Sequence, residues 1–116
     1  IIRIYYRAYE DIKDPEFGIA IFDKDDNYVC GPNSLESKDI RIIKKGKGHV
    51  DFHIKDLCLV ESRYIVHVGV MRQHKKGVEN SYDFRSRIAS FTIRNAKDHV
   101  SYGFIRLKGV WKDVEE

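Results

Sequence analysis

Side chains alternate between apolar and polar in run after run of this chain, and this two-residue period constrains the fold more than any other feature. Such alternation is typical of a β-strand with one buried and one exposed face. It occurs at residues 2–9, 17–22, 49–55, 64–71, 89–94 and 102–111, and a short apolar run lies at 28–30. The chain has 14 Ile and 10 Val but only 4 Leu and 4 Ala, which disfavours a helical bundle, a coiled coil or a Rossmann domain. The sequence therefore predicts an all-β fold, an antiparallel β-sandwich of the immunoglobulin-like or jelly-roll kind.

Turn-forming residues separate the runs and set the expected order of the strands. Asp14-Pro15 ends the first run, residues 23–27 form the turn of a hairpin, and residues 31–34 break the next strand. Residues 73–87 are polar and irregular, and a further break lies at 95–101. With 116 residues, the chain has the size of one domain, so we expect a single unit over residues 1–116. The side chains expected inside it are Ile4, Tyr6, Phe17, Ile19, Ile21, Val50, Phe52, Ile54, Tyr64, Val66, Val68, Phe91 and Ile93.

The charge balance argues against nucleic acid as a partner. The 21 Lys and Arg and the 18 Asp and Glu give a net charge of +3, and the two signs are interleaved along the chain. No stretch approaches the roughly 18 apolar residues of a membrane-spanning helix. Cys30 and Cys58 lie in apolar surroundings and are interpreted as buried free thiols, with a single disulfide as the alternative.

The sequence offers no motif for catalysis, a cofactor or a metal ion. His49 and His53 are four residues apart, which on a strand separates them by about 13 Å, too far to share one ion. The Asp residues of 23–27 lack the closing Glu of an EF-hand, and no nucleophile, phosphate-loop or dinucleotide motif occurs. We therefore expect no enzyme, no metal and no cofactor. A glycoside hydrolase is the weakest hypothesis, because Asp51 is the only carboxylate inside a well-patterned strand.

Six segments, in their order and spacing, resemble the C-terminal domain of the Wzt family. They are Ile4-Tyr5-Tyr6-Arg7-Ala8-Tyr9, Asp14-Pro15-Glu16-Phe17-Gly18-Ile19-Ala20-Ile21, the segment 28–34, the segment 57–64, the segment 82–91, and 102–107 with Trp111. Together they cover nearly the whole chain.

The resemblance implies a non-catalytic carbohydrate-binding module of the ATP-binding subunit of an ABC transporter. Such a transporter exports O-antigen, the polysaccharide of lipopolysaccharide, or a related cell-envelope polysaccharide. The resemblance also implies a homodimer that exchanges a terminal strand, for which 102–111 is the candidate, and a cytoplasmic position at the inner face of the cell membrane. The chain would then be the C-terminal part of a longer subunit, whose nucleotide-binding domain contacts the transmembrane subunit. The alternatives are a β-sandwich module for protein interaction or dimerisation, and the same module attached to a methyltransferase.

The expected carbohydrate site lies on the outward face of one sheet, formed by 17–22, 28–30, 62–71 and 89–94. That face combines aromatic rings with the small residues Ala20 and Gly69, which leave room for a sugar ring. The residues expected to bind are Phe22 and Tyr28 by stacking, His67, Thr92 and Arg94 by polar contacts, and Tyr82 and Arg85 on a loop that closes one end. The opposite face is more uniformly charged and is interpreted as a solvated exterior, with Arg3, Arg7, His49, Asp51, His53 and Lys55.

Overall fold

The fold consists almost entirely of β-strands. The computed structural model describes residues 1–37, 39–72, 81–94 and 101–114. Its elements are β1 (Ile2–Ala8), β2 (Ile12–Lys13), β3 (Glu16–Asp23), β4 (Tyr28–Cys30), the short 3₁₀ helix η1 (Ser34–Glu36), β5 (Ile42–Ile43), β6 (Gly46–Phe52), β7 (Ser62–Met71) and β8 (Ser81–Ile93).

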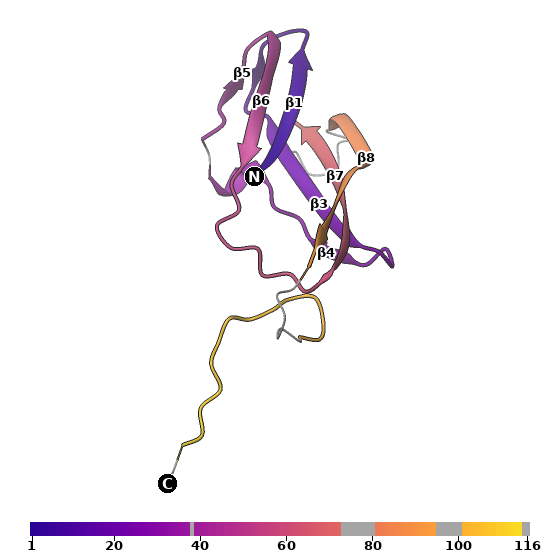
Figure 1. Ribbon diagram of the computed structural model, residues 1–116. Coiled ribbons are helices and arrows are strands. Elements are labelled where there is room, and N and C mark those ends of the chain that lie inside the picture. Colours follow the sequence, from indigo (N-terminus) through magenta and orange to yellow (C-terminus); the bar gives the residue numbers. More distant parts are fainter. Residues whose placement is uncertain (38, 73–80, 95–100, 115–116) are drawn as a thin grey trace.

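The strands form two layers, as the sequence predicts. One layer is a four-stranded antiparallel sheet in the order β4-β3-β7-β8 (Figure 1). The other contains the antiparallel pair β1-β6 and the short pair β2-β5. The four segments expected to share one sheet do so, and the all-β antiparallel prediction is confirmed.

The core lies between the layers, and β3 shows how the sequence builds it. Its side chains alternate strictly, with Phe17, Ile19 and Ile21 buried and their neighbours half-buried on the outward face. A first cluster joins Ile19 and Ile21 of β3 to Tyr64 and Val66 of β7, and a second cluster groups Phe17 with Ala8 and Ile43. Most of the predicted interior residues pack into these clusters, whereas Ile54 lies beyond the end of β6 at Phe52 and belongs to neither.

Tyr64 is the most completely buried large side chain, with 1% of its surface exposed. Its ring stacks on Phe91 with 5.3 Å between centroids, and its hydroxyl donates a 2.6 Å hydrogen bond to the carbonyl of Val60, four residues upstream. Burial raises the pKa of this hydroxyl. A tyrosine that bonds back to the backbone just upstream is a recurrent device of immunoglobulin-like sandwiches.

The turn at residues 23–27 connects the hairpin strands β3 and β4, and the Asp23 side chain forms hydrogen bonds within it. The Asp23 carboxylate accepts hydrogen bonds of 2.9 Å from the backbone amides of Asp25 and Asn27 and from the side chain of Asn27. The Asn27 bonds hold the pKa of Asp23 below its usual value. This carboxylate caps its own turn, as the sequence interpretation of a hairpin requires.

Three sequence expectations differ from the structure. The predicted irregular region 73–87 contains the start of β8 at Ser81, where Ser, Asp and Arg are mixed with Tyr82 and Phe84 and every residue to 87 is exposed. Residues 73–80 lie outside the described part, as do 95–100 of the predicted break. In the described part of the chain, the predicted strand 102–111 forms one isolated bridge, between Leu59 and Ile105, and the chain beyond it extends away from the body (Figure 1). Cys30 and Cys58 are free, but Cys30 is exposed and Cys58 is half-buried.

A bidentate ion pair joins the two strands of the β1-β6 sheet. Arg3 donates from Nε and Nη2 to the two carboxylate oxygens of Asp51, at 2.8 and 2.9 Å, across directly opposite positions. These bonds hold the pKa of Asp51 below its usual value. Because the pKa of Asp51 is lower in the folded chain than in the unfolded chain, its carboxylate stabilises the fold at pH values above the unfolded-state pKa. This contribution is lost as the pH falls through the lowered folded-state pKa.

We therefore expect Arg3→Gln to destabilise the chain at pH 7 but much less in acid. The difference between the two proteins should begin to shrink below about pH 4, the usual pKa of an aspartate in an unfolded chain, and should vanish as the pH falls through the lowered pKa of Asp51. Urea unfolding followed by far-UV circular dichroism at pH 7 and pH 3 measures both differences. An equal difference at the two pH values would show that the ion pair does not link stability to pH.

Candidate functional site

A pair of glycines hollows the outward face of the four-stranded sheet. Gly18 of β3 and Gly69 of β7 lie directly opposite each other, and Gly69 is opposite Phe84 of β8. Neither glycine adds a side chain to the sheet surface; a Cβ built at Gly18 would lie 3.5 Å from the end of Met71, and one built at Gly69 would lie 3.4 Å from the ring of Phe84. The resulting depression, here called the outer groove, has a volume of about 560 Å³. Its lining includes Glu16, Gly18, Ala20, Tyr28, Asn33, His67, Gly69, Met71, Ser81 and Phe84.

A row of four rings borders the outer groove. Tyr28 packs against Phe22 at 5.1 Å between centroids, Phe22 against His67 at 4.7 Å, and His67 against Phe84 at 6.1 Å. The rings come from β4, β3, β7 and β8 in the spatial order of the sheet. Tyr28 and Phe84 are 62% and 59% exposed, so the two ends of the row offer free ring surface to a ligand.

The segment 31–34 forms the wall of the outer groove beside β3. Pro32 accepts a 2.9 Å bond from the amide of Ile19, and the Ser34 hydroxyl accepts one of the same length from the amide of Phe17. A Cβ at Gly31 would overlap the hydroxyl of Tyr28, so a side chain at position 31 would displace this exposed ring. The wall itself is held by hydrogen bonds to the backbone of β3.

The chemistry of the outer groove suits a polyhydroxylated ring. Aromatic faces pack against C–H groups, and the polar side chains of Glu16, Asn33, His67 and Ser81 can exchange hydrogen bonds with hydroxyls. Among the described residues, no group of three or more His, Cys, Asp or Glu side chains is placed to hold a metal ion. The arrangement is one for binding and orientation.

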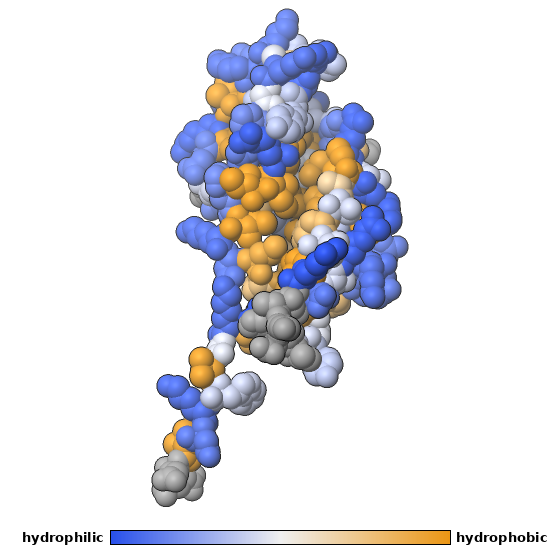
Figure 2. Space-filling model, in the orientation of Figure 1, coloured by the Kyte–Doolittle hydropathy of each residue, from blue (hydrophilic) through white to orange (hydrophobic). Residues whose placement is uncertain are grey.

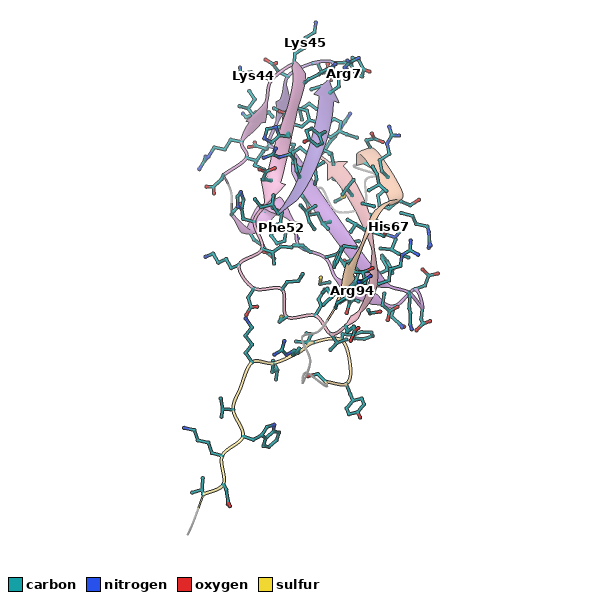
Figure 3. All side chains as sticks on the ribbon, in the orientation of Figure 1. Arg7, Lys44, Lys45, Phe52, His67 and Arg94 are labelled. Atoms are coloured by element: carbon teal, nitrogen blue, oxygen red, sulfur yellow. The ribbon has the colours of Figure 1, made fainter. Side chains whose placement is uncertain are left out.

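Four of the seven predicted site residues lie on this sheet with outward-facing side chains, but only three gather at the outer groove. Phe22, Tyr28 and His67 belong to the row of rings. Thr92 pairs with Arg63, four residues along β7 from His67, which separates it from the groove by about 13 Å. Arg94 follows the end of β8 and lies still farther along the sheet, towards the C-terminal tail (Figure 3). One sugar ring cannot touch both His67 and Arg94.

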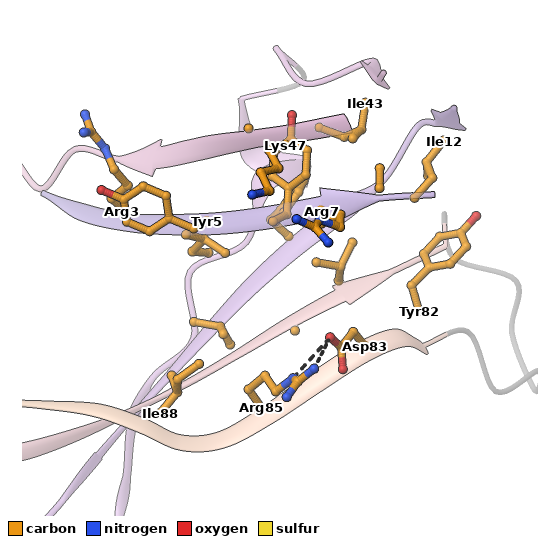
Figure 4. A pocket seen from close by; sticks show the side chains of 18 of the residues that line it. Arg3, Tyr5, Arg7, Ile12, Ile43, Lys47, Tyr82, Asp83, Arg85 and Ile88 are labelled. Atoms are coloured by element: carbon orange, nitrogen blue, oxygen red, sulfur yellow. Dashed lines mark hydrogen bonds and ion pairs between the residues drawn. The ribbon is translucent and has the colours of Figure 1, made fainter. Parts of the chain in front are cut away.

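Tyr82 and Arg85 lie elsewhere, on strand β8 rather than on a loop. Both line a second depression of about 950 Å³ between the two layers, here called the interlayer cleft (Figure 4). Its walls include Ile4, Tyr6 and Ala8 of β1 and Val66, Val68 and Val70 of β7. Arg85 faces this cleft because it is opposite Val68, an inward residue, and it forms a 3.2 Å ion pair with Asp83. The prediction that these two residues close the outer groove is wrong.

Phe84, Gly18 and Asn33 are site residues that the sequence interpretation missed. Phe84 falls in the region taken as irregular, although the alternation of Tyr82 and Phe84 with Asp83 and Arg85 signals a strand. Gly18 matters only through its register with Gly69, and that pairing depends on contacts between distant segments.

Comparisons with known proteins agree on the fold and the family. The chain resembles a solved structure described as the crystal structure of the C-terminal domain of Wzt, with a TM-score of 0.76 and 18% sequence identity. The similarity covers 97% of this chain and 66% of the solved chain, so this chain spans less than two thirds of that protein. No curated protein sequence matches at the significance level applied.

Within the described residues, no helix is long and apolar enough to cross a membrane. The family model of the Wzt C-terminal domain matches residues 1–107, which is nearly the full length and includes every strand and the whole outer groove. The chain belongs to the Wzt C-terminal domain family.

Proposed function

We propose that this chain is a carbohydrate-binding module that recognises an O-antigen or a related cell-envelope polysaccharide for export by an ABC transporter. The outer groove is the binding site, with the polysaccharide lying across Gly18 and Gly69 beside the row of rings. The module acts at the cytoplasmic face of the membrane, coupled through a nucleotide-binding domain to the transmembrane subunit.

The row of Tyr28, Phe22, His67 and Phe84 along a glycine-floored groove carries this proposal. Membership of the Wzt C-terminal domain family supports a carbohydrate-binding role associated with an ABC transporter in general. A non-catalytic role fits the groove, where Glu16 is the single carboxylate among the described lining residues. Glycosidases in most families need two facing carboxylates.

An array of bacterial envelope polysaccharides, probed with the wild-type chain and with Gly69→Leu, tests the proposal. A Cβ at position 69 lies 3.4 Å from the ring of Phe84, so a leucine would fill the groove without entering the core. Wild type is expected to retain one polysaccharide or a small set and to leave it uncleaved, while Gly69→Leu binds none. Equal binding by both proteins would place recognition outside the outer groove.

We also propose that two copies of the chain associate through their C-terminal segments. Residues 104 and 106 bond to the backbone of Val60 and Cys58 at 3.0 and 2.6 Å, but the apolar residues beyond them lie uncovered. Leu107, Val110 and Trp111 are 86%, 82% and 101% exposed. The interlayer cleft offers a matching apolar surface beside the unpaired edge of β8, and Figure 2 shows apolar side chains gathered between the layers on this face.

Deleting residues 107–116 is therefore expected to convert a dimer to a monomer. The shortened chain keeps the bridge between Leu59 and Ile105, so its fold should be retained. Analytical ultracentrifugation over a range of concentrations measures the mass of each form, and circular dichroism checks the fold. A monomer mass for the longer chain at high concentration would contradict the association, as would an unchanged dimer after the deletion.

A further inference from the structure

The outward face of the β1-β6 sheet carries three cross-strand pairs in a row. Arg3 is opposite Asp51, Tyr5 is opposite His49, and Arg7 is opposite Lys47. Their side chains alternate with the inward residues of β1, and Arg3, Tyr5, Arg7 and Lys47 also reach the mouth of the interlayer cleft (Figure 4). We call these six residues the β1-β6 platform.

Tyr5 presents an exposed aromatic ring at the centre of the β1-β6 platform. The ring is 75% exposed and packs beside His49 at 5.9 Å between centroids. On its other side, two residues along β1, lies the Arg3–Asp51 ion pair. An exposed ring between these neighbours offers a surface on which a sugar ring can stack.

Arg7 and Lys47 place two positive charges directly opposite each other. Directly opposite residues have Cβ atoms about 5 Å apart, and like charges in that arrangement destabilise a strand pair. Within the described part of the chain, neither side chain has a carboxylate partner, whereas nearby Lys44 pairs with Asp11 and Arg85 pairs with Asp83. An anion between Arg7 and Lys47 would relieve the repulsion and accept charge-assisted hydrogen bonds from both.

We propose that the β1-β6 platform is a second saccharide site, specific for an acidic sugar. The ring of the sugar stacks on Tyr5, and its carboxylate or phosphate lies between Arg7 and Lys47. Tyr5 and Arg7 are two residues apart on one face of β1, about 6.6 Å, which is close to the reach of one acidic sugar from its ring to its charged group. The other edge of the sugar ring lies against the Arg3–Asp51 ion pair, whose polar groups can exchange hydrogen bonds with the hydroxyls of the sugar.

This site is separate from the outer groove, since it lies on the other sheet. It therefore does not depend on the proposed function of that groove. A free anion would need only the two cations, and a nucleic acid would need a longer basic track than one pair on a chain of net charge +3. The combination of one ring with one cation pair fits a single acidic sugar residue best.

Nitrogen-15 chemical-shift titration of the chain tests this inference. The probes are digalacturonic acid, galactose 6-phosphate, the uncharged dimethyl ester of digalacturonic acid, inorganic phosphate and oligothymidylate. At least one of the two acidic sugars should shift the amides of Tyr5, Arg7, Lys47 and His49 and bind at least tenfold more tightly than the ester or inorganic phosphate.

The variant R7Q/K47Q should abolish these shifts, and Tyr5→Ala should weaken the acidic sugar at least tenfold. The matched control K24Q/K55Q removes two charges outside the platform, beyond the ends of β3 and β6, and should leave binding unchanged. The site is overturned if neither acidic sugar binds at the platform or if the control weakens binding as much as R7Q/K47Q. Equal binding of inorganic phosphate, or tighter binding of oligothymidylate, would replace the acidic sugar with a simple anion or a nucleic acid and so also overturn the proposal. Because the outer groove is not altered by these variants, its own test with Gly69→Leu remains independent.

Discussion

Replacing Tyr64 with alanine is expected to lower the free energy of unfolding by about 3–5 kcal/mol, the cost of removing a large buried ring. Tyr64 is 1% exposed, stacks on Phe91 and bonds to the carbonyl of Val60, so its loss opens the core and leaves that carbonyl unpaired. Tyr64→Phe keeps the packing and removes only the hydroxyl, which should cost about 1 kcal/mol. Urea unfolding at pH 7 measures both.

Tyr102→Ala is the matched control, because Tyr102 is 91% exposed. Its substitution should change stability by no more than about 0.5 kcal/mol. If Tyr64→Ala were as stable as Tyr102→Ala, the core would not be organised around Tyr64.

Replacing His67 with alanine is expected to weaken polysaccharide binding by about thirtyfold, the effect of losing about 2 kcal/mol at a central contact. His67 is the middle ring of the row, in contact with Phe22 on one side and Phe84 on the other. Its removal takes away a polar group and leaves both neighbours without support. Isothermal titration calorimetry with the polysaccharide retained on the array measures the change.

His53→Ala provides the comparison for this variant. His53 follows the end of β6, is exposed, and belongs neither to the outer groove nor to the β1-β6 platform. The affinity of His53→Ala for the polysaccharide should equal that of wild type. Arg94→Ala should reduce affinity only for fragments long enough to extend from the groove past the end of β8, since about six strand residues separate His67 from the level of Arg94. An equal loss in His53→Ala and His67→Ala would remove His67 from the site.

Much of the fold could be predicted because local alternation reports which face of a strand is buried. The buried positions Phe17, Ile19 and Ile21 follow directly from the pattern of β3, and Tyr64 and Val66 from that of β7. Such a pattern fails where a strand has no covered face. Residues 81–87 at the start of β8 are all exposed, and the region interpreted as irregular from the sequence forms a strand there through its pairing with β7.

For the C-terminal segment the error is the opposite one, because its alternation predicts a strand where the structure has an isolated β-bridge. Residues 102–111 alternate like a strand, but among the residues that the structure describes their one β-bridge joins Ile105 to Leu59. Alternation shows that a segment is able to pair, and the partner strand is a separate question that local sequence does not answer.

The candidate site was predicted in part for a similar reason. Phe22, Tyr28 and His67 share a face that their own strands define, so the sequence brings them together. The position of Tyr82 and Arg85 depends on the register between β7 and β8, which is irregular between Val66 and Val68. A bulge of this kind cannot be located from the sequence of one strand, so the side of the sheet that these two residues face could not be predicted.

The most direct test of the account is a map of the polysaccharide on the chain. Nitrogen-15 chemical shifts are recorded with and without a fragment of the polysaccharide retained on the array. The account predicts that the largest changes occur at Gly18, His67, Gly69 and Phe84, which meet at the outer groove. Changes confined to the walls of the interlayer cleft, with the outer groove unaffected, would contradict it.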